Sequence, residues 1–314
     1  MRFALMIEPQ QGMSYADQLA VARHAEAGGF ETLFRSDHYE SFPGASDRPT
    51  TDAWAVLAGL ARETTRIGLG ALMSPVAYRL PGNLAKVAAT VDEMSGGRLE
   101  IALGAGWHED EHRRHGFPFP SIGDRATMLE EQLEVIRGLW YEPDGWSFHG
   151  RFYSVVDARF RPRPGRHVNL LIGGEGTPRS MRIAARFADE FNLSSASPER
   201  AAERFSALDD ACRAAGRDPA TLHRSAMVGV LVGADRAEVD RRAEALLALF
   251  GPGADADEWL AEREKRWMVG TPDQARAIVR RYADAGCERL MLQDFVPWDL
   301  DMIDLLGAEL VGRV

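Results

Sequence analysis

Short apolar runs alternate with helix-like segments along the whole chain, and this alternation constrains the fold more than any other feature. Buried strands are predicted for eight runs: Phe3–Ile7, Thr32–Arg35, Ile67–Met73, Leu99–Leu103, Leu170–Ile172, Glu190–Leu193, Ala226–Val232 and Leu290–Gln293. The segments between them space apolar residues as helices do, and several begin with a cap such as Ser14 or a first-turn proline such as Pro81. Such alternation is typical of parallel β/α units, and eight strands close a barrel. We therefore predict one α/β domain over residues 1–314, a (β/α)8 TIM barrel.

One segment interrupts the alternation after the fourth strand and its helix. The sequence that follows Gly145, WSFHGRFYSVVDARF, has Gly150 near its centre and is rich in aromatic and β-branched residues. That composition around a glycine predicts a β-hairpin. Pro162 and Pro164 follow it, so we expect an insertion over about residues 141–165 rather than a strand of the barrel.

The overall charge and the cysteine count exclude several classes of protein. The formal net charge is −10 with a pI of about 5.4, so no basic face is available for a nucleic-acid backbone. The two cysteines, Cys212 and Cys287, form no framework, which predicts a reducing compartment. No apolar run approaches the roughly 18 residues of a membrane span, and the apolar start predicts a strand rather than a signal sequence. We expect a cytoplasmic protein.

Two glycines and an aromatic residue follow the fourth predicted strand, as Gly104-Ala105-Gly106-Trp107. Glycine lets a flat ligand approach the backbone closely. Parallel α/β enzymes carry their chemistry at the carboxyl ends of their strands. This loop is therefore a candidate binding site.

The next five residues, His108-Glu109-Asp110-Glu111-His112, match the H-E-x-x-H pattern of zinc metalloproteases. That chemistry needs both imidazoles on one helix face and a third ligand downstream, whereas here the pattern follows a strand-end loop. A solvated, acidic helix start explains these residues more simply, so no metal site is predicted. A zinc hydrolase acting through His108 and His112 stays open as a remote alternative.

A histidine follows the second predicted strand, in Ser36-Asp37-His38. Histidine exchanges protons near neutral pH, and its place at a strand end favours a role as acid or base. The alternative is a histidine that only hydrogen-bonds its own loop.

A glycine-rich loop, Gly173-Gly174-Glu175-Gly176-Thr177, precedes a predicted helix. Free backbone amides and the helix dipole favour an anion such as a phosphate at this position, and Arg179 and Arg182 lie close by in the sequence. The spacing is not that of a dinucleotide-binding fingerprint. A tight turn without a ligand is the alternative.

Taken together, these stretches resemble the luciferase-like monooxygenase family, bacterial (β/α)8 enzymes that use flavins or deazaflavins. The resemblance runs nearly end to end and rests on the Ser36-Asp37-His38 loop, TTRIGLGALMSPVAYRLPGNLAKVAATVDEMSGGRL from Thr64, GAGWHEDEHRRHGFPFPSIGDR from Gly104, IGGEGTPRSMRIAARFADEFN from Ile172 and VGTPDQARAIVRRYADAGCERLML from Val269. The pattern is most similar to the branch that uses coenzyme F420, whose ring passes a hydride at C5.

The resemblance implies a role for each matching residue. His38 is expected beside the reacting carbon, with Asp37 in the cofactor loop, and a cis peptide bond between Leu72 and Met73 is expected behind the ring. Other expected cofactor contacts are Ser74, Ala105, Gly106 and Trp107 near the ring, and Gly173, Gly174, Gly176 and Thr177 at the phosphate. Trp107 stands where the sugar-phosphate dehydrogenases of the family carry a glutamate acid/base, which leaves Glu109 and Glu8 as weaker substitutes.

We therefore expect an oxidoreductase in which F420 exchanges a hydride with a small, mostly apolar substrate and His38 moves the proton. Loops after the strands predict a substrate pocket lined by Glu8, Phe42, Phe295 and Trp298. An FMN-dependent two-component monooxygenase, served by a separate cofactor reductase, is the nearest alternative. A non-catalytic ligand-binding barrel is a further one, and by analogy with the family we expect a homodimer.

Overall fold

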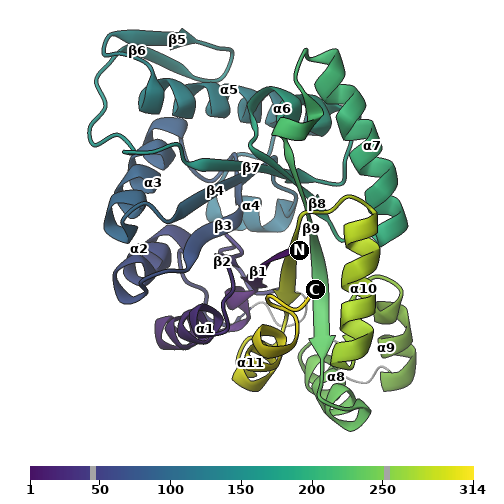
Figure 1. Cartoon of the computed structure of the whole chain (residues 1–314). Coiled ribbons are helices and arrows are strands. Elements are labelled where there is room, and N and C mark those ends of the chain that lie inside the picture. The colour runs from purple at the N-terminus through teal and green to yellow at the C-terminus, as the bar shows by residue number, and fades with distance from the viewer. Residues whose placement is uncertain (43–46, 251–254) are drawn as a thin grey trace.

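The computed structural model describes residues 1–42, 47–250 and 255–314 of the chain, and its centre is a closed parallel barrel (Figure 1). Eight strands run in the order β11, β1, β2, β3, β4, β7, β8, β9, and β9 pairs with both β8 and β11. Their bounds are β1 Arg2–Ile7, β2 Thr32–Arg35, β3 Gly68–Pro75, β4 Leu99–Gly104, β7 Asn169–Gly174, β8 Glu190–Ser194, β9 His223–Val232 and β11 Arg289–Asp294. The predicted (β/α)8 barrel is confirmed.

Helices surround the barrel on its outside, except for the short α4, which follows β4 and is seen behind the strands (Figure 1). They are α1 Tyr15–Ala27, α2 Ala53–Glu63, α3 Pro81–Ser95, α4 Glu109–His115, α5 Ile122–Tyr141, α6 Pro178–Phe187, α7 Pro198–Ala214, α8 Arg236–Phe250, α9 Ala256–Glu264, α10 Pro272–Asp284 and α11 Leu300–Glu309, with short 3-10 turns η1 Pro9–Gln11 and η2 Pro219–Thr221. Local signals fix several of their starts, because Ser14 and Asp17 form a capping box on α1 and Pro81 opens α3. In the described part of the chain, no helix is long and apolar enough to cross a membrane.

A two-stranded antiparallel sheet lies between α5 and β7, where the hairpin was expected. Its strands are β5 Trp146–His149 and β6 Ser154–Ala158. The hairpin is fastened to α5, since the Glu131 carboxylate accepts hydrogen bonds from the amides of residues 151–153. The ring of Trp146 occupies the space beside Gly138, where an added methyl group would lie 2.2 Å from it.

Two elements between α8 and α10 are not among those predicted from the sequence. The charged segment Trp259–Trp267 contains most of α9, whose Trp259 and Leu260 are buried. A short strand follows it, β10 Met268–Gly270, which pairs with the end of β9 outside the barrel. Three strand residues are too few for a periodic pattern, and the apolar face of α9 is too narrow to stand out among its charges.

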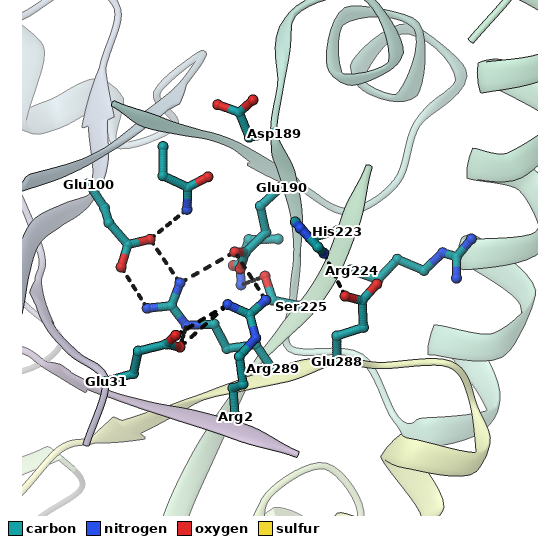
Figure 2. Close-up of polar contacts among 12 residues, drawn as sticks. Arg2, Glu31, Glu100, Asp189, Glu190, His223, Arg224, Ser225, Glu288 and Arg289 are labelled. Atoms are coloured by element: carbon teal, nitrogen blue, oxygen red, sulfur yellow. Dashed lines mark hydrogen bonds and ion pairs between the residues drawn. The ribbon is translucent and has the colours of Figure 1, made fainter. Parts of the chain in front are cut away.

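Polar side chains close the amino-terminal end of the barrel (Figure 2). Arg289 lies at the centre, with both terminal nitrogens 2.8 Å from the Glu100 carboxylate and a third contact of 3.3 Å to Glu190. Arg289 is 1% exposed, and Asn169 and Thr32 donate further hydrogen bonds to Glu100. This end of the barrel is thus filled by paired charged side chains.

Apolar side chains fill the middle of the barrel. The interior cluster consists of Ala4, Met6, Phe34, Leu72, Ala102, Leu171 and Met291, with Met73 and Met227 packed against it. The Phe34 ring takes the space beside Gly70, where an added methyl group would lie 2.6 Å from it. A binding site formed by the barrel strands is therefore expected at the opposite end, where the strands terminate.

Candidate functional site

His38 follows β2 at the carboxyl end of the barrel and is held by a buried carboxylate. Its Nδ1 lies 2.9 Å from Oε2 of Glu111, a fully buried residue in the first turn of α4. The histidine therefore does not bond its own loop, which was the alternative predicted from the sequence. It is instead fixed by a residue that follows β4.

From residues that the structure describes, Glu111 accepts four hydrogen bonds. Besides His38, the donors are the Tyr78 hydroxyl and the amides of Tyr39 and Glu40. Burial by itself would raise the pKa of Glu111, but the bonds from His38 and Tyr78 outweigh burial and lower this pKa to about 2. An ionised carboxylate can only accept, so Nδ1 of His38 carries a proton, and in the neutral form of the ring the free lone pair is then on Nε2.

The expectation of a solvated helix start was wrong for two of the five residues of the H-E-x-x-H segment. Glu111 and His112 are buried, whereas Glu109 and Asp110 are exposed. The reason is that this first turn of α4 packs on the loop after β2, a contact that no local pattern reveals. Sequence reasoning therefore missed Glu111, and its only local sign was its place just after a strand end.

The two histidines of that segment form hydrogen bonds within α4 and its N-cap and are not arranged as metal ligands. His108 is the N-cap, and its Nδ1 accepts a hydrogen bond from the Glu111 amide. The His112 Nδ1 bonds the His108 carbonyl at 2.8 Å, and burial lowers the pKa of this imidazole. Within residues 1–42, 47–250 and 255–314, no three histidine, cysteine or acidic side chains are grouped as metal ligands would be. The zinc hydrolase alternative has no support in this geometry.

Aromatic side chains surround His38. The ring of Phe42 meets it edge-on at 4.5 Å between centroids, and the ring of Trp107 lies at 6.0 Å. Phe42 and Trp107 also contact each other, at 5.3 Å. Trp107 is 64% exposed, which is unusual for so large an apolar side chain. These residues form an apolar wall that a planar or apolar ligand would cover.

Asp37, which precedes the histidine, belongs to a buried ion pair. Arg79 donates to it at 2.5 and 3.2 Å, and the Ser74 hydroxyl donates at 2.7 Å. Ser74 in turn accepts a hydrogen bond from the Trp54 indole, and Arg79 reaches Asp52 at 2.6 Å. Both carboxylate oxygens of Asp37 are thus engaged by protein, so its side chain fixes the loop that carries His38.

Methionine and glycine shape the floor of the barrel mouth. The peptide bond between Leu72 and Met73 is cis, as the family resemblance implies. The Met73 side chain lies over Gly104 and Gly173, and a methyl group added at Gly173 would come within 2.1 Å of its sulfur. Met73 thus occupies the space that a side chain at Gly173 of β7 would need, whereas a methyl group at Gly104 of β4 would lie at an ordinary contact distance of 3.5 Å.

The loop after β7 presents free backbone donors. Thr177 caps α6 by accepting from the Ser180 amide, Pro178 has no N–H group, and Gly174 and Gly176 have positive φ angles of 157° and 74°. The amides of Glu175, Gly176 and Thr177 donate to no acceptor within the described protein. Such a loop at a helix start can bind an anion.

The two arginines expected to help this loop do not do so. Arg179 is paired with Glu130 at 3.1 Å and also bonds the Thr127 hydroxyl. Arg182 lines an outer groove of about 760 Å³ between α5, α6 and α7, together with residues that precede β7 and β8. The prediction of an anion site at the loop stays open, but its assignment to these arginines was wrong.

The four predicted pocket residues lie in different surroundings. Phe42 contacts His38, as described above. Glu8 is 7% exposed and accepts hydrogen bonds from Gln10 and from Gln293 at the end of β11. Phe295 stacks on Trp267 at 4.8 Å, and Trp298 is 38% exposed. Glu8 is thus hydrogen-bonded to β11, but no contact between these four side chains joins them into one wall.

Comparison with known proteins gives consistent matches over the whole chain. A family model described as luciferase-like monooxygenase matches residues 1–289. The chain is 30% identical to the F420-dependent glucose-6-phosphate dehydrogenase of Nakamurella multipartita, over 100% of this chain and 96% of that protein. It is 29% identical to the pyrimidine monooxygenase RutA of a Bradyrhizobium species, over 86% of this chain and 73% of the relative. A solved F420-dependent secondary alcohol dehydrogenase in complex with an F420-acetone adduct has the same fold, with a TM-score of 0.83 at 21% identity over 99% of this chain and 98% of that one.

Proposed function

Because the chain belongs to the luciferase-like monooxygenase family, we propose that it is an oxidoreductase that uses coenzyme F420 to exchange a hydride with a small organic substrate. Relatives that match most of the chain are named as F420-dependent dehydrogenases, which supports this choice. One contact carries the proposal: a histidine at the barrel mouth, His38, is oriented by the buried carboxylate of Glu111. That arrangement prepares a base for a substrate proton.

The residues at the mouth fit a planar cofactor with an anionic tail. Free amides after β7 face outward at the start of α6, where a phosphate is favoured. The apolar floor formed by Leu72 and Met73 suits the face of a ring, and the glycines at 104 and 106 allow its close approach. We propose that the ring contacts Met73, Ala105 and Gly106, and that the phosphate contacts the loop from Gly173 to Thr177.

Bound in this mouth, the deazaflavin supplies the hydride acceptor or donor at its C5. The protein then has to handle one proton. The free lone pair on Nε2 of His38 takes the hydroxyl proton of an alcohol as its carbon is oxidised, and the protonated ring returns it to a carbonyl oxygen in the reverse direction. Glu111 holds the imidazole in the tautomer that this step needs.

The apolar wall of Phe42 and Trp107 around His38 favours a substrate that is mostly apolar. Trp107 has no group that could relay a proton. Glu109 is exposed, and Glu8 is already bonded to two glutamine amides. His38 is therefore the residue we assign to proton transfer, and we propose no sugar phosphate as the substrate.

The alternative is an FMN-dependent monooxygenase supplied with reduced flavin by a separate reductase. It is favoured by the relatives named as pyrimidine monooxygenases. Absorbance and fluorescence titrations of the purified protein with F420 and with reduced FMN distinguish the two. We expect F420 to bind at micromolar concentrations or below, and tight FMN binding with negligible F420 binding would overturn our choice.

The role of His38 is tested with His38→Ala and a matched control, His149→Ala, which changes an exposed histidine of the hairpin. We expect His38→Ala to keep F420 affinity within about twofold and to lower turnover by about a hundredfold or more. His149→Ala should change neither quantity. Full turnover in His38→Ala would show that another group moves the proton.

A further inference from the structure

The short turn after β1 holds the loop that carries His38 on both sides of this histidine. The turn is η1, and its two glutamines, Gln10 and Gln11, are buried, with 1% and 3% of their surface exposed. The Gln10 side chain accepts a hydrogen bond of 2.5 Å from the Ser36 hydroxyl. The Gln11 side chain donates to the carbonyl of Phe42. The turn therefore contacts the loop both before and after His38.

The amide group of Gln11 has a single orientation. Its nitrogen faces the Phe42 carbonyl, which can only accept, and its oxygen faces Nη1 of Arg48 at 2.7 Å, which can only donate. Arg48 in turn donates to the carbonyl of Leu249 in α8 at 3.3 Å, and its Cβ lies 3.7 Å from the position of a methyl group added at Gly12. Gln11 is thus fixed by an arginine that is itself anchored on α8 and packed beside η1.

The position of Phe42 depends on this glutamine. Among the described residues, Gln11 provides the one hydrogen bond to the main chain of Phe42. The Phe42 ring meets the rings of His38 and His108 at 4.5 Å and that of Trp107 at 5.3 Å between centroids. Aromatic contacts tolerate a range of geometries, whereas the loss of a buried hydrogen bond leaves polar groups unpaired. Gln11 therefore determines where the apolar wall stands beside His38.

The contacts that fix the base are separate from those that fix the wall. His38 is bonded to Glu111, and Asp37 before it is engaged by Arg79. Gln11 bonds none of these side chains. Loss of the Gln11 hydrogen bonds should therefore displace the wall and leave the base in place.

We propose that Gln11 is a positioning residue that sets the size of the substrate pocket by holding Phe42 against His38, and that it thereby favours small substrates over bulky ones. A wall in fixed contact with the base limits the space for a substrate beside it. The nature of the substrate rests on the function proposed above, whereas the control of Phe42 by Gln11 does not.

The kinetic test is a double-mutant cycle between Gln11 and Phe42. Gln11→Met keeps the length of the side chain and removes both hydrogen bonds, Phe42→Ala removes the wall, and a third variant combines the two changes. Thr64→Val is the matched control, because the buried Thr64 also donates to a carbonyl and accepts from an arginine. It lies between α2 and β3, at the amino-terminal end of the barrel. Isopropanol and cyclooctanol serve as small and bulky alcohols, and the absorbance of F420 follows its reduction.

We expect Gln11→Met to raise the KM for isopropanol by about fivefold and to keep kcat within about twofold. Its preference for isopropanol over cyclooctanol, as the ratio of kcat/KM, should fall by about fivefold. Gln11→Met should add nothing to Phe42→Ala, and Thr64→Val should match the wild type. The inference would be overturned by an unchanged KM, by a loss confined to kcat, or by an effect of Gln11→Met that is as large without the Phe42 ring as with it.

A second measurement needs no substrate. The ring current of Phe42 shifts the NMR resonances of the His38 imidazole protons, which His38→Ala identifies by their disappearance. In Gln11→Met these resonances should move toward their positions in Phe42→Ala, and in Thr64→Val they should stay. Unchanged His38 resonances in Gln11→Met would overturn the inference.

The two measurements distinguish failure of the inference from failure of the proposed function. If the wild type oxidises neither alcohol with F420, this substrate class fails and the NMR measurement alone decides the role of Gln11. Circular dichroism verifies that each variant is folded. If Gln11→Met does not fold, Gln11→Glu replaces it, because glutamate keeps the acceptor for Arg48 and loses only the donor to Phe42. The same shifts are then expected.

Discussion

Replacing Glu111 with glutamine tests the central contact of the site, because it removes one charge and almost no volume. In the wild type, this carboxylate accepts from His38, Tyr78 and two backbone amides. A glutamine can offer only its single oxygen to these donors, and its NH2 group would face at least one of them. The exposed Glu109, in the same first turn of α4, provides a matched control as Glu109→Gln.

The size of the effect follows from the pKa of Glu111, which is lowered from its ordinary 4.5 to about 2. That difference corresponds to about 3 kcal/mol of stability at neutral pH. A carboxylate with a lowered pKa contributes this stability above its unfolded pKa, and the contribution is lost as the pH falls from about 5 through 2. Glutamine resembles the protonated acid, so Glu111→Gln should lose the contribution at every pH.

Urea denaturation followed by tryptophan fluorescence measures this difference. We expect Glu111→Gln to be about 3 kcal/mol less stable than the wild type at pH 7, and the gap to shrink to about half near pH 3. Glu109→Gln should stay within about 0.5 kcal/mol of the wild type. A gap below about 0.5 kcal/mol for Glu111→Gln at pH 7, or a gap that does not change with pH, would refute the reasoning.

The same variant has a functional consequence. Without the carboxylate, the His38 tautomer is no longer fixed, so we expect turnover to fall by about a hundredfold while the cofactor Kd changes little. A rise in Kd at constant kcat would instead assign Glu111 to binding rather than to orienting His38.

Three further predictions concern the barrel itself. Arg289→Met removes the cation that pairs with the Glu100 carboxylate and leaves the buried Glu190 with only a 4.0 Å contact to Arg2, so it should cost about 3–5 kcal/mol in urea denaturation. A loss below about 1 kcal/mol would show that water reaches these carboxylates. Burial raises the pKa of Asp294 to about 7, so the stability that its protonated form contributes is lost as the pH rises through 7. The free energy of unfolding of Asp294→Asn should therefore exceed that of the wild type by about 2 kcal/mol more at pH 8 than at pH 5. Equal gains at both pH values would contradict this. Gly173→Ala places a methyl group against the flexible end of Met73, so it should lower the stability by about 1 kcal/mol and weaken cofactor binding in a fluorescence titration. The control is Gly82→Ala on α3, where nothing lies within 4 Å of the new methyl group. It should change neither stability nor binding.

The strands and most of the helices could be predicted because each leaves a local pattern. Apolar runs bounded by glycine mark strands, and caps such as Ser14 mark helix starts. The strand β10 and the buried face of α9 escaped because a three-residue strand and a two-residue apolar face are too short for periodicity to register. The loops that follow β2, β4 and β7 could also be identified from the sequence, since their composition is unusual.

The partners of the side chains in those loops were decided only by the tertiary structure. His38 and Glu111 are 73 positions apart, and Arg179 and Glu130 are 49 apart. Each pair meets because barrel closure sets neighbouring strand ends and helices side by side, a relation that no local spacing encodes. Sequence alone therefore determined which residues stand at the mouth of the barrel. Which of them have free hydrogen-bonding groups, as the Gly176 amide has and Arg179 has not, depends on the partners that folding brings within hydrogen-bond distance.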